Sequence, residues 1–432
     1  MHRVISKIAV LAILAGTFIT AAHADSDKRY VNDKFNELYD GRGHLDQYGQ
    51  KKHDASVQLG PRPFYLVEGM DDGPLKHRLM QCENGPFYRT DFSIGHRGAA
   101  MQFPEHTRAS YEAGARMGAG IVECDVTFTK DGELVCRHAE CDLHTTTNIV
   151  ATPLNAQCSV PWSGPGSSPQ CCASDLTLAQ FKTLRGKMDA SNPSATTAQG
   201  YLGGTASWRT DLYTGRGTLV ALKESIQINK ENGVKHTPEL KSGNPARINA
   251  IFGSQAQYAQ KLIDTLKMAG VNPKDVWAQS FNKDDVIYWI QREPQFGKQA
   301  VYLDSFDPPA IPRLTLDELK QLKQQGVKIF APPIPALLSV NDANEIVPSQ
   351  YALDIKSVGF DIITWSFERA DLRNGAATGG FYYQFDPLGK AVKKDSDMYK
   401  ALDVLARKVG IIGIFSDWPA TVTYYANCMG LK

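Results

Sequence analysis

The chain has 432 residues and an almost balanced charge, with 47 basic side chains against 46 acidic ones. Nucleic-acid-binding proteins usually carry a basic excess, so this balance argues against nucleic acid as a partner. Hydrophobic residues make up 42% of the chain and charged residues 22%, which is typical of a globular protein and not of a disordered one. The length allows one large domain or two to three small ones.

The first 24 residues have the pattern of a secretory signal peptide. Arg3 and Lys7 precede an uncharged apolar run over 8–18, and Ala22-His23-Ala24 forms a small-x-small cleavage site. The run is shorter than the roughly 20 apolar residues that a membrane anchor needs. The sequence therefore predicts an exported protein, periplasmic or secreted, with no stable membrane insertion once the signal is removed.

From about residue 91 the chain alternates short β-rich runs with helical patterns. Strand-like runs lie at 92–95, 121–127, 235–240, 275–280, 300–303, 327–331, 361–365 and 411–415, and helical patterns between them include 107–117, 219–232, 255–268, 316–325 and 396–409. Several helical patterns end in a glycine before the next strand, as helix C-caps do, namely Gly118, Gly233, Gly270, Gly326 and Gly410. Eight such units predict an α/β fold of the (β/α)8 TIM-barrel type. An open doubly wound sheet is less favoured, because no Gly-x-Gly-x-x-Gly follows the first strand.

Two segments interrupt this alternation. Residues 25–90 form a polar N-terminal extension ahead of a barrel domain at 91–432, and a long insertion at about 139–217 is rich in Ser, Thr, Gly, Pro and Cys. Four of the eight cysteines, at 141, 158, 171 and 172, would staple this insertion into an ordered cover. The others are Cys124 and Cys136 near the second strand, and Cys82 and Cys428, which flank the barrel and would tie its ends together if they paired. Zinc is a weaker alternative to disulfides, since no Cys-x-x-Cys pair is present.

Carboxylates concentrate at the predicted carboxyl ends of the strands, where barrel enzymes carry their active sites. Glu123 and Asp125 are two residues apart on one strand and share a face, and Glu239 ends the next predicted barrel strand. Three clustered carboxylates repel one another unless a cation or a proton intervenes. An all-oxygen set suits one divalent cation, Ca²⁺ or Mg²⁺, as cofactor. In the alternative interpretation, Arg97 and Lys241 neutralise the carboxylates and no metal binds.

A tight turn at 129–132 predicts a β-hairpin after the second barrel strand. A register in which the first and last residues of this turn face each other places His138 opposite Glu123 and Cys136 opposite Asp125. All four side chains would then lie on the face that carries the carboxylates. A slip of one residue would move His138 to the other face.

This set of side chains predicts phosphoryl chemistry. Arg97, Lys241 and a metal ion would hold phosphate oxygens, and His96 and His138 would act as general base and general acid near pH 7. A glycosidase would not need the histidines. Trp365, at the end of another predicted strand, is expected to line the substrate pocket, although packing in the core would explain it equally well.

Several stretches resemble motifs of the glycerophosphodiester phosphodiesterase family. Residues 94–107 resemble its opening motif, 123–138 its second and 238–241 its third, and 279–281 and 413–419 resemble later strand motifs. The resemblance extends in order from about 91 to 425, and the Pro-Glu-His-Thr sequence at 104–107 resembles exported members. One departure is Ala139, because the second histidine of the family is usually followed by Asp.

The resemblance implies metal-dependent hydrolysis of a small-molecule glycerophosphodiester to glycerol 3-phosphate and an alcohol, through a cyclic phosphate. It also implies Glu123, Asp125 and Glu239 as metal ligands, His96 and His138 as the acid/base pair, and Arg97 and Lys241 on the phosphate. One alternative is phospholipase D-like cleavage of sphingo- or lysophospholipids on the same barrel, and another is a secreted barrel that binds a ligand without catalysis. The oligomeric state and the alcohol head group stay open.

Overall fold

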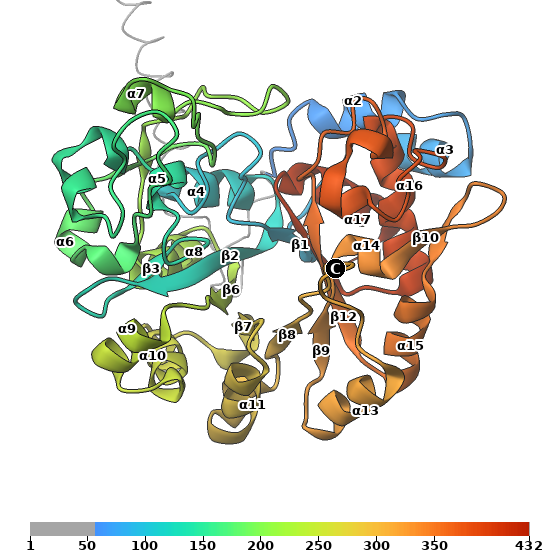
Figure 1. Cartoon of the computed structure of the whole chain (residues 1–432). Coiled ribbons are helices and arrows are strands. Elements are labelled where there is room, and N and C mark those ends of the chain that lie inside the picture. The colour runs from blue at the N-terminus through green and yellow to red at the C-terminus, as the bar shows by residue number, and fades with distance from the viewer. Residues whose placement is uncertain (1–56, 432) are drawn as a thin grey trace, which may run out of the picture. The chain divides into compact units, whose positions relative to one another are not determined.

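The computed structural model describes residues 57–431, so the predicted signal peptide and the first part of the predicted extension lie outside the described residues. A nine-stranded sheet forms its centre (Figure 1). Eight of these strands are parallel and form a closed barrel, because β1 pairs with both β13 and β2. The predicted (β/α)8 barrel is therefore confirmed.

The barrel strands overlap all eight runs that the sequence predicts. They are β1 (Thr90–Gly95), β2 (Ala119–Phe128), β6 (Lys235–Leu240), β7 (Gln279–Ser280), β8 (Val301–Leu303), β9 (Ile329–Ala331), β12 (Asp361–Phe367) and β13 (Gly413–Ser416). Apolar side chains of these strands fill the barrel interior, among them Ile94, Ile121, Leu303, Ile363 and Phe415. The inside is thus a packed core, and the polar site must lie at an end of the barrel.

Helices surround the strands and pack on them through their apolar faces. The main ones are α4 (Arg108–Arg116), α8 (Leu222–Glu231), α9 (Pro245–Phe252), α10 (Gln255–Met268), α11 (Lys283–Arg292), α13 (Leu316–Gln324), α15 (Gln350–Val358), α16 (Met398–Asp403) with the π-helix η8 (Val404–Val409), and α17 (Pro419–Met429). Shorter elements between the later strands are η4 (Pro273–Asp275), α12 (Pro294–Gly297), α14 (Ile334–Leu337), the hairpin β10 (Leu338–Val340) and β11 (Ile346–Pro348), η5 (Ala376–Thr378), η6 (Gly380–Tyr383) and η7 (Asp395–Asp397). The five glycines predicted to end helices all have positive φ, which only glycine adopts without strain.

The predicted hairpin is present, formed by β2 and β3 (Leu134–Cys136), but its predicted register is wrong. Val126, not Asp125, lies opposite Cys136. The backbone N–H of Thr129 donates to the carbonyl of Glu133 at 2.9 Å, so the loop contains one residue more than predicted. Gly132 takes a positive φ of 77° there, as the last residue of a three-residue hairpin loop commonly does.

The register places Cys136 on the face of β2 that points away from the carboxylates, where it forms a disulfide with Cys124. His138 nevertheless reaches the carboxylates, because β3 ends at Cys136 and the chain then leaves the strand. The backbone N–H of Arg137 donates to the carbonyl of Asp125 at 2.7 Å and holds this turn in place. His138 thus lies beside the carboxylates as expected, but the turn after β3 places it there and not the alternation of side chains along a strand.

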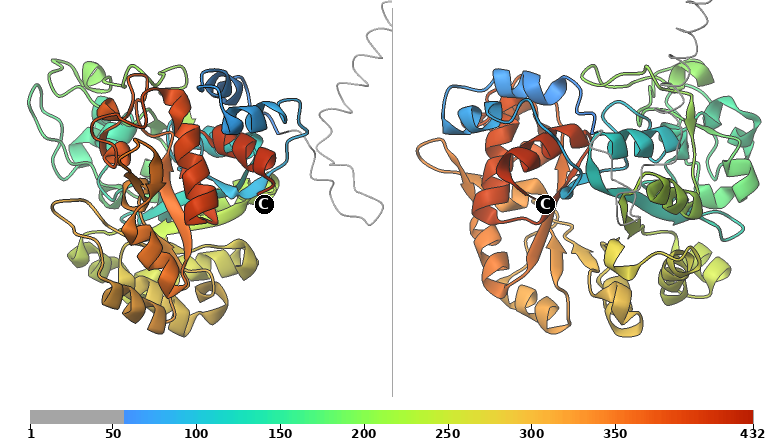
Figure 2. Two further views of the ribbon diagram at one scale, coloured as in Figure 1. Left: turned by 90° about the vertical axis from the view of Figure 1, so that its right-hand side faces the viewer. Right: turned by 180° about the vertical axis from the view of Figure 1, so that it is seen from behind.

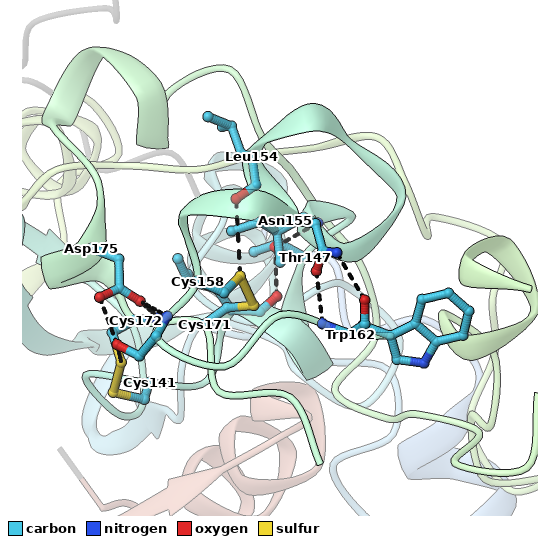
Figure 3. The surroundings of a disulfide bond; sticks show 12 residues. Cys141, Thr147, Leu154, Asn155, Cys158, Trp162, Cys171, Cys172 and Asp175 are labelled. Carbon is cyan, nitrogen blue, oxygen red and sulfur yellow. Dashed lines mark hydrogen bonds between the residues drawn. A yellow bond between two sulfur atoms is a disulfide. The ribbon is translucent and has the colours of Figure 1, made fainter. Parts of the chain in front are cut away.

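The insertion is ordered and has a small hydrophobic core of its own, which includes Ile149, Phe181 and Leu184. Its elements are α5 (Leu143–Thr146), η1 (Ile149–Ala151), η2 (Pro153–Gln157), η3 (Ala173–Asp175), α6 (Leu178–Phe181), β4 (Arg185–Gly186), α7 (Ala198–Tyr201) and β5 (Gly217–Thr218). Disulfides Cys141–Cys172 and Cys158–Cys171 staple it, as expected (Figure 3). The insertion, coloured teal to green, extends from the side of the barrel at β2 and β3, away from α13 and α15 (Figures 1 and 2).

Before the first strand, α2 (Arg62–Glu68) and α3 (Pro74–Met80) pack against α17. Arg62 forms an ion pair of 2.5 Å with Glu368, just past the end of β12. The predicted Cys82–Cys428 disulfide is present and ties this segment to α17. Within residues 57–431 no helix is both long and apolar enough to cross a membrane.

Candidate active site

A pocket of about 730 Å³ opens at the carboxyl ends of the barrel strands. All eight side chains that the sequence predicts for the site line it, namely His96, Arg97, Glu123, Asp125, His138, Glu239, Lys241 and Trp365. They come from β1, β2, β6 and β12 and from the turn after β3. The barrel thus brings together residues that are up to 269 positions apart in the sequence.

Three buried carboxylates form the centre of this pocket. Asp125 lies opposite Glu239 in the register of β2 and β6, and carboxylate oxygens of Glu123, Asp125 and Glu239 lie within 4.8 Å of one another. The two Glu123 oxygens accept hydrogen bonds from Gln279 Nε2 at 2.9 Å and from the backbone N–H of Arg97 at 3.0 Å. These bonds fix the direction in which Glu123 points.

The pKa values of the three carboxyl groups show how unfavourable it is to ionise all of them at once. Burial and the neighbouring Asp125 and Glu239 raise the pKa of Glu123 well above its usual value. Burial raises the pKa of Glu239 to about 8. Asp125 behaves differently, because Lys241, His106 and Arg97 outweigh its burial and hold its pKa well below the ordinary value. If all three carboxyl groups were ionised, their negative charge would exceed what the surrounding positive groups compensate.

The same cluster has the properties of a site for a hard divalent cation. Asp125 Oδ1 is buried and forms no hydrogen bond within residues 57–431, whereas Glu239 Oε1 forms an ion pair of 2.6 Å with Lys241 Nζ. Unpaired buried carboxylate oxygens are destabilising unless a cation or a proton occupies the space between them. An all-oxygen set of this kind fits Mg²⁺ or Ca²⁺, and its chemistry does not distinguish the two.

His96 follows the end of β1 and is held by Asp417, which follows β13. Its Nδ1 lies 2.5 Å from Asp417 Oδ1, and the other oxygen of Asp417 accepts from Arg369 at 2.8 Å. Burial lowers the pKa of His96, although the Asp417 carboxylate opposes that shift. In the neutral ring, donation from Nδ1 to Asp417 leaves the lone pair on Nε2, which points toward Ser366 Oγ at 3.3 Å and Glu123 Oε2 at 3.7 Å.

His138 has a different environment. Its half-buried ring forms no hydrogen bond to any residue in 57–431 and faces the pocket. Burial, followed by the positive charges of Arg97 and Lys241, lowers the pKa of His138 well below the ordinary value. One imidazole is thus oriented by a carboxylate and the other is free to turn toward a ligand.

Residues 96–421 match the model of the glycerophosphoryl diester phosphodiesterase family. The chain belongs to this family. It is therefore a hydrolase of the glycerophosphodiester phosphodiesterase class.

Individual relatives agree with the family match. A protein of Arthroderma benhamiae named "Extracellular protein" is 44% identical over 249 residues, which are 56% of this chain and 100% of that one. A glycerophosphodiester phosphodiesterase of Arabidopsis thaliana is 23% identical over 366 residues, 77% of this chain and 85% of that one. A crystal structure of a putative glycerophosphoryl diester phosphodiesterase from Silicibacter pomeroyi shares the fold, with a TM-score of 0.53, 16% identity and coverage of 80% of this chain and 95% of that one.

For this phosphodiesterase, the structure adds two groups that the sequence did not single out. Arg369, after β12, lines the pocket and forms ion pairs with Asp417 and with Asp189 of the insertion, both at 2.8 Å. His106 is fully buried, with Nε2 2.8 Å from Asp125 Oδ2 and Nδ1 2.9 Å from the Tyr111 hydroxyl. Burial lowers the pKa of His106 to about 4, so the ring is a neutral support for Asp125. The sequence carries no signal for Arg369, and His106 lies within the motif at 104–107, where no spacing assigns it a role in the site.

Ala139, which departs from the family motif, lies close to a carboxylate of the insertion. Asp142 lines the pocket, and its Oδ2 accepts from the backbone N–H of Ala139 at 3.3 Å. Burial raises the pKa of Asp142 to about 6. The insertion thus supplies an acidic side chain three residues further along the chain.

Proposed function

We propose that this phosphodiesterase is exported and hydrolyses glycerophosphodiesters to glycerol 3-phosphate and an alcohol, with one divalent cation and two catalytic histidines. The observation that carries the proposal is the convergence of three buried carboxylates and two imidazoles on one pocket. The division into a signal peptide at 1–24, an extension at 25–90 and a barrel domain at 91–432 belongs to the same proposal. Four disulfides within residues 57–431 fit a secreted protein and support the export.

Glu123, Asp125 and Glu239 would hold the cation, Ca²⁺ or Mg²⁺. When bound there, such a cation polarises phosphate oxygens and offsets negative charge that develops during the reaction. Lys241 and Arg97 line the same pocket and contribute two further positive charges toward phosphate oxygens. Their present partners, Glu239 and Glu105, hold them in place at 2.6 and 2.8 Å.

The histidines would move the protons. In the first step one imidazole accepts the proton of the glycerol hydroxyl next to the ester, and that oxygen attacks phosphorus. The bond between phosphorus and the alcohol oxygen breaks, and the other imidazole donates a proton to the leaving alcohol. A cyclic glycerol phosphate results. Water then attacks phosphorus with the roles of the histidines reversed, and the ring opens to glycerol 3-phosphate.

Histidine substitutions test this mechanism. His96→Ala and His138→Ala are each expected to lower the release of glycerol phosphate from glycerophosphocholine by roughly 10²- to 10⁴-fold. His77→Ala is the matched control, because His77 is an exposed histidine on α3 that does not line the pocket. Circular dichroism would confirm that each variant is folded. Full activity in either of the first two variants would remove that histidine from the mechanism.

Metal add-back tests the cation. The chelated enzyme is expected to lose activity and to regain it with Ca²⁺ or Mg²⁺, and calorimetry should show one binding site that Glu123→Gln weakens strongly. Asp317→Asn, an exposed change on α13, should leave the binding unchanged. Turnover that survives complete chelation would contradict the metal-dependent reaction. Assays on lysophospholipid and sphingomyelin vesicles beside the soluble diester would show whether phospholipase D-like cleavage is the better description.

A further inference from the structure

The segment after β12 places a positive side chain in the site from a constrained backbone. Glu368 has a φ of 61°, a left-handed conformation that is unfavourable for a residue other than glycine. Its buried carboxylate accepts hydrogen bonds from Arg62 of α2 at 3.0 Å and from the Thr421 hydroxyl of α17. Arg369 follows directly and lines the pocket. Two outer helices therefore hold the turn that carries Arg369 into the site.

Three carboxylates surround the guanidinium of Arg369. Its Nη1 donates to Asp417 Oδ2 and its Nη2 donates to Asp189 Oδ2, each at 2.8 Å. Nη2 also lies 3.7 Å from Glu105 Oε2. These bonds fix the guanidinium between the barrel and the insertion and use both of its terminal nitrogens.

Asp417 depends on this guanidinium. Its side chain is fully buried, with Oδ1 on Nδ1 of His96 and Oδ2 on Arg369. Among residues 57–431, Arg369 is the only Lys or Arg that forms an ion pair with Asp417. Burial favours the protonated form of Asp417, but Arg369, followed by His96, outweighs burial and lowers the pKa of Asp417 below its ordinary value. Without Arg369, a buried carboxylate would have no fixed positive charge bonded to it.

The state of Asp417 decides which nitrogen of His96 carries the proton. An ionised carboxylate only accepts hydrogen bonds, so Nδ1 of a neutral imidazole must donate to it and the lone pair lies on Nε2. A protonated Asp417 would instead donate to Nδ1, and the proton of the imidazole would then be on Nε2. In that form His96 has no lone pair on the nitrogen that lies 3.7 Å from Glu123, and it accepts no proton there.

We propose that Arg369 is a positioning residue for the hydrolysis: it holds the Asp417 carboxylate in place and, through it, fixes the proton of His96 on Nδ1. The proposal rests on the proposed function, since it takes His96 as one of the two groups that move protons. Asp189 steadies the other side of the guanidinium and is itself paired with Arg209 of the insertion at 2.5 Å. Arg369 acts on the reaction through Asp417 and not by contact with the phosphate.

The first test separates kcat from KM. Arg369→Gln removes the positive charge and should lower kcat for glycerophosphocholine about 10²-fold, with KM changed less than about threefold, because a misplaced imidazole proton impairs proton transfer and not binding. Arg369→Lys keeps the charge without the planar pair of donors and should retain about a tenth of the wild-type kcat.

Arg373→Gln is the matched control for these variants. Arg373 is an exposed arginine of the same segment that also donates to the insertion, at Ser207, but does not line the pocket. Its replacement should leave kcat and KM unchanged. A rise in KM with unchanged kcat in Arg369→Gln would overturn the proposal and assign Arg369 to direct binding of the phosphate.

A double-mutant cycle tests whether Arg369 acts through Asp417. The amide of Asp417→Asn carries no charge for Arg369 to hold, so adding Arg369→Gln to this variant should lower kcat by less than about threefold further. If Arg369→Gln instead costs its full factor of about 10² in the Asp417→Asn background, the two residues act independently and the proposal is overturned.

A measurement without turnover separates this proposal from the proposed function. Nitrogen NMR of the enzyme with isotopically labelled histidines, in the presence of Mg²⁺ or Ca²⁺, reports which ring nitrogen carries the proton, and His96→Gln identifies the signals of His96. We expect the proton on Nδ1 in the wild type and on Nε2 in Arg369→Gln. Should Arg369→Gln fail to fold, Arg369→Lys serves for the same comparison, with a partial change expected.

The two proposals fail in different ways. The same His96 tautomer in the wild type and the Arg369 variant would overturn the role of Arg369, whatever the activity of either protein. If glycerophosphodiesters are not hydrolysed, the proposed function fails, and the NMR comparison still decides whether Arg369 fixes the proton of His96.

Discussion

The barrel and the insertion contribute to one pocket, but they are held together in different ways. The barrel closes through eight hydrogen-bonded strands around an apolar interior. The insertion has short elements and depends on two disulfides and on ion pairs, such as those of Arg247 with Glu140 and Asp175. Every side chain proposed for the chemistry lies outside the insertion, which supplies only part of the surrounding wall. The insertion can therefore change in sequence without altering the side chains proposed for the reaction.

The largest effect is expected on the barrel side, from Asp417→Asn. The amide cannot replace the carboxylate that orients Nδ1 of His96, so kcat should fall on the order of 10³-fold while the fold is kept. Steady-state kinetics on glycerophosphocholine would measure the loss. Asp403→Asn, which removes a carboxylate paired with Arg407 on the outer helices, is the control. A fall of less than tenfold would show that His96 does not depend on Asp417.

Next in size is the loss of an insertion disulfide. Replacing Cys141 and Cys172 together by Ser opens a link between residues 31 positions apart and should destabilise the insertion by about 3–4 kcal/mol. Hydrogen exchange should show faster opening of α5 and η3, with the protection of the barrel strands unchanged. Equal loss of protection in both regions would mean that barrel and insertion unfold as one unit.

A smaller, pH-dependent effect is expected from Asp142→Asn. The folded-state pKa of about 6 lies above the ordinary value of 3.8, so the folded protein binds this proton more tightly and loses stability as the pH rises from about 4 through 6. The asparagine variant has no such proton to lose. Its free energy of unfolding should therefore exceed that of the wild type by about 1–3 kcal/mol at pH 7.5. Denaturant unfolding at pH 4 and pH 7.5 would measure the free energies of unfolding of both proteins. If the advantage of the variant does not grow with pH, burial does not raise the pKa of Asp142.

The smallest effect concerns the junction between the two regions. Asp189→Asn weakens two ion pairs of Asp189, one of 2.5 Å with Arg209 inside the insertion and one of 2.8 Å with Arg369 of the barrel. KM should therefore rise about three- to fivefold with kcat almost unchanged. Asp175→Asn is the matched control, because Asp175 pairs with Arg247 and does not line the pocket. A similar rise in KM for both variants would point to general loosening of the insertion.

The barrel and the carboxylate cluster could be predicted because they depend on local patterns. Strand runs, helix-ending glycines and the spacing of Glu123 and Asp125 are visible along the chain, and the order of strands around a barrel follows from the order in sequence. The register of the hairpin could not be predicted in the same way. A single additional loop residue, which lets Thr129 bond to Glu133, decided it.

The residues that the sequence did not reveal act through long-range contacts. Arg369 joins Asp417 of the barrel to Asp189 of the insertion, and His106 supports Asp125 from a buried position. Neither follows from periodicity, because their partners are fixed only once the barrel is closed. The aromatic lining of the pocket is similar, since Phe281 and Phe381 come from segments 100 positions apart.

The Cys82–Cys428 disulfide turns most of the described chain into a covalent ring. A single proteolytic cut anywhere between these two residues opens the ring but releases no fragment, because both pieces stay joined through the sulfur atoms. The exposed stretch around Leu212, which is 73% exposed, is a natural place for such a cut. A nicked molecule would keep its eight strands on one covalent framework and would run as two pieces only after reduction. A single cut in this stretch would therefore leave the enzyme in one covalent piece.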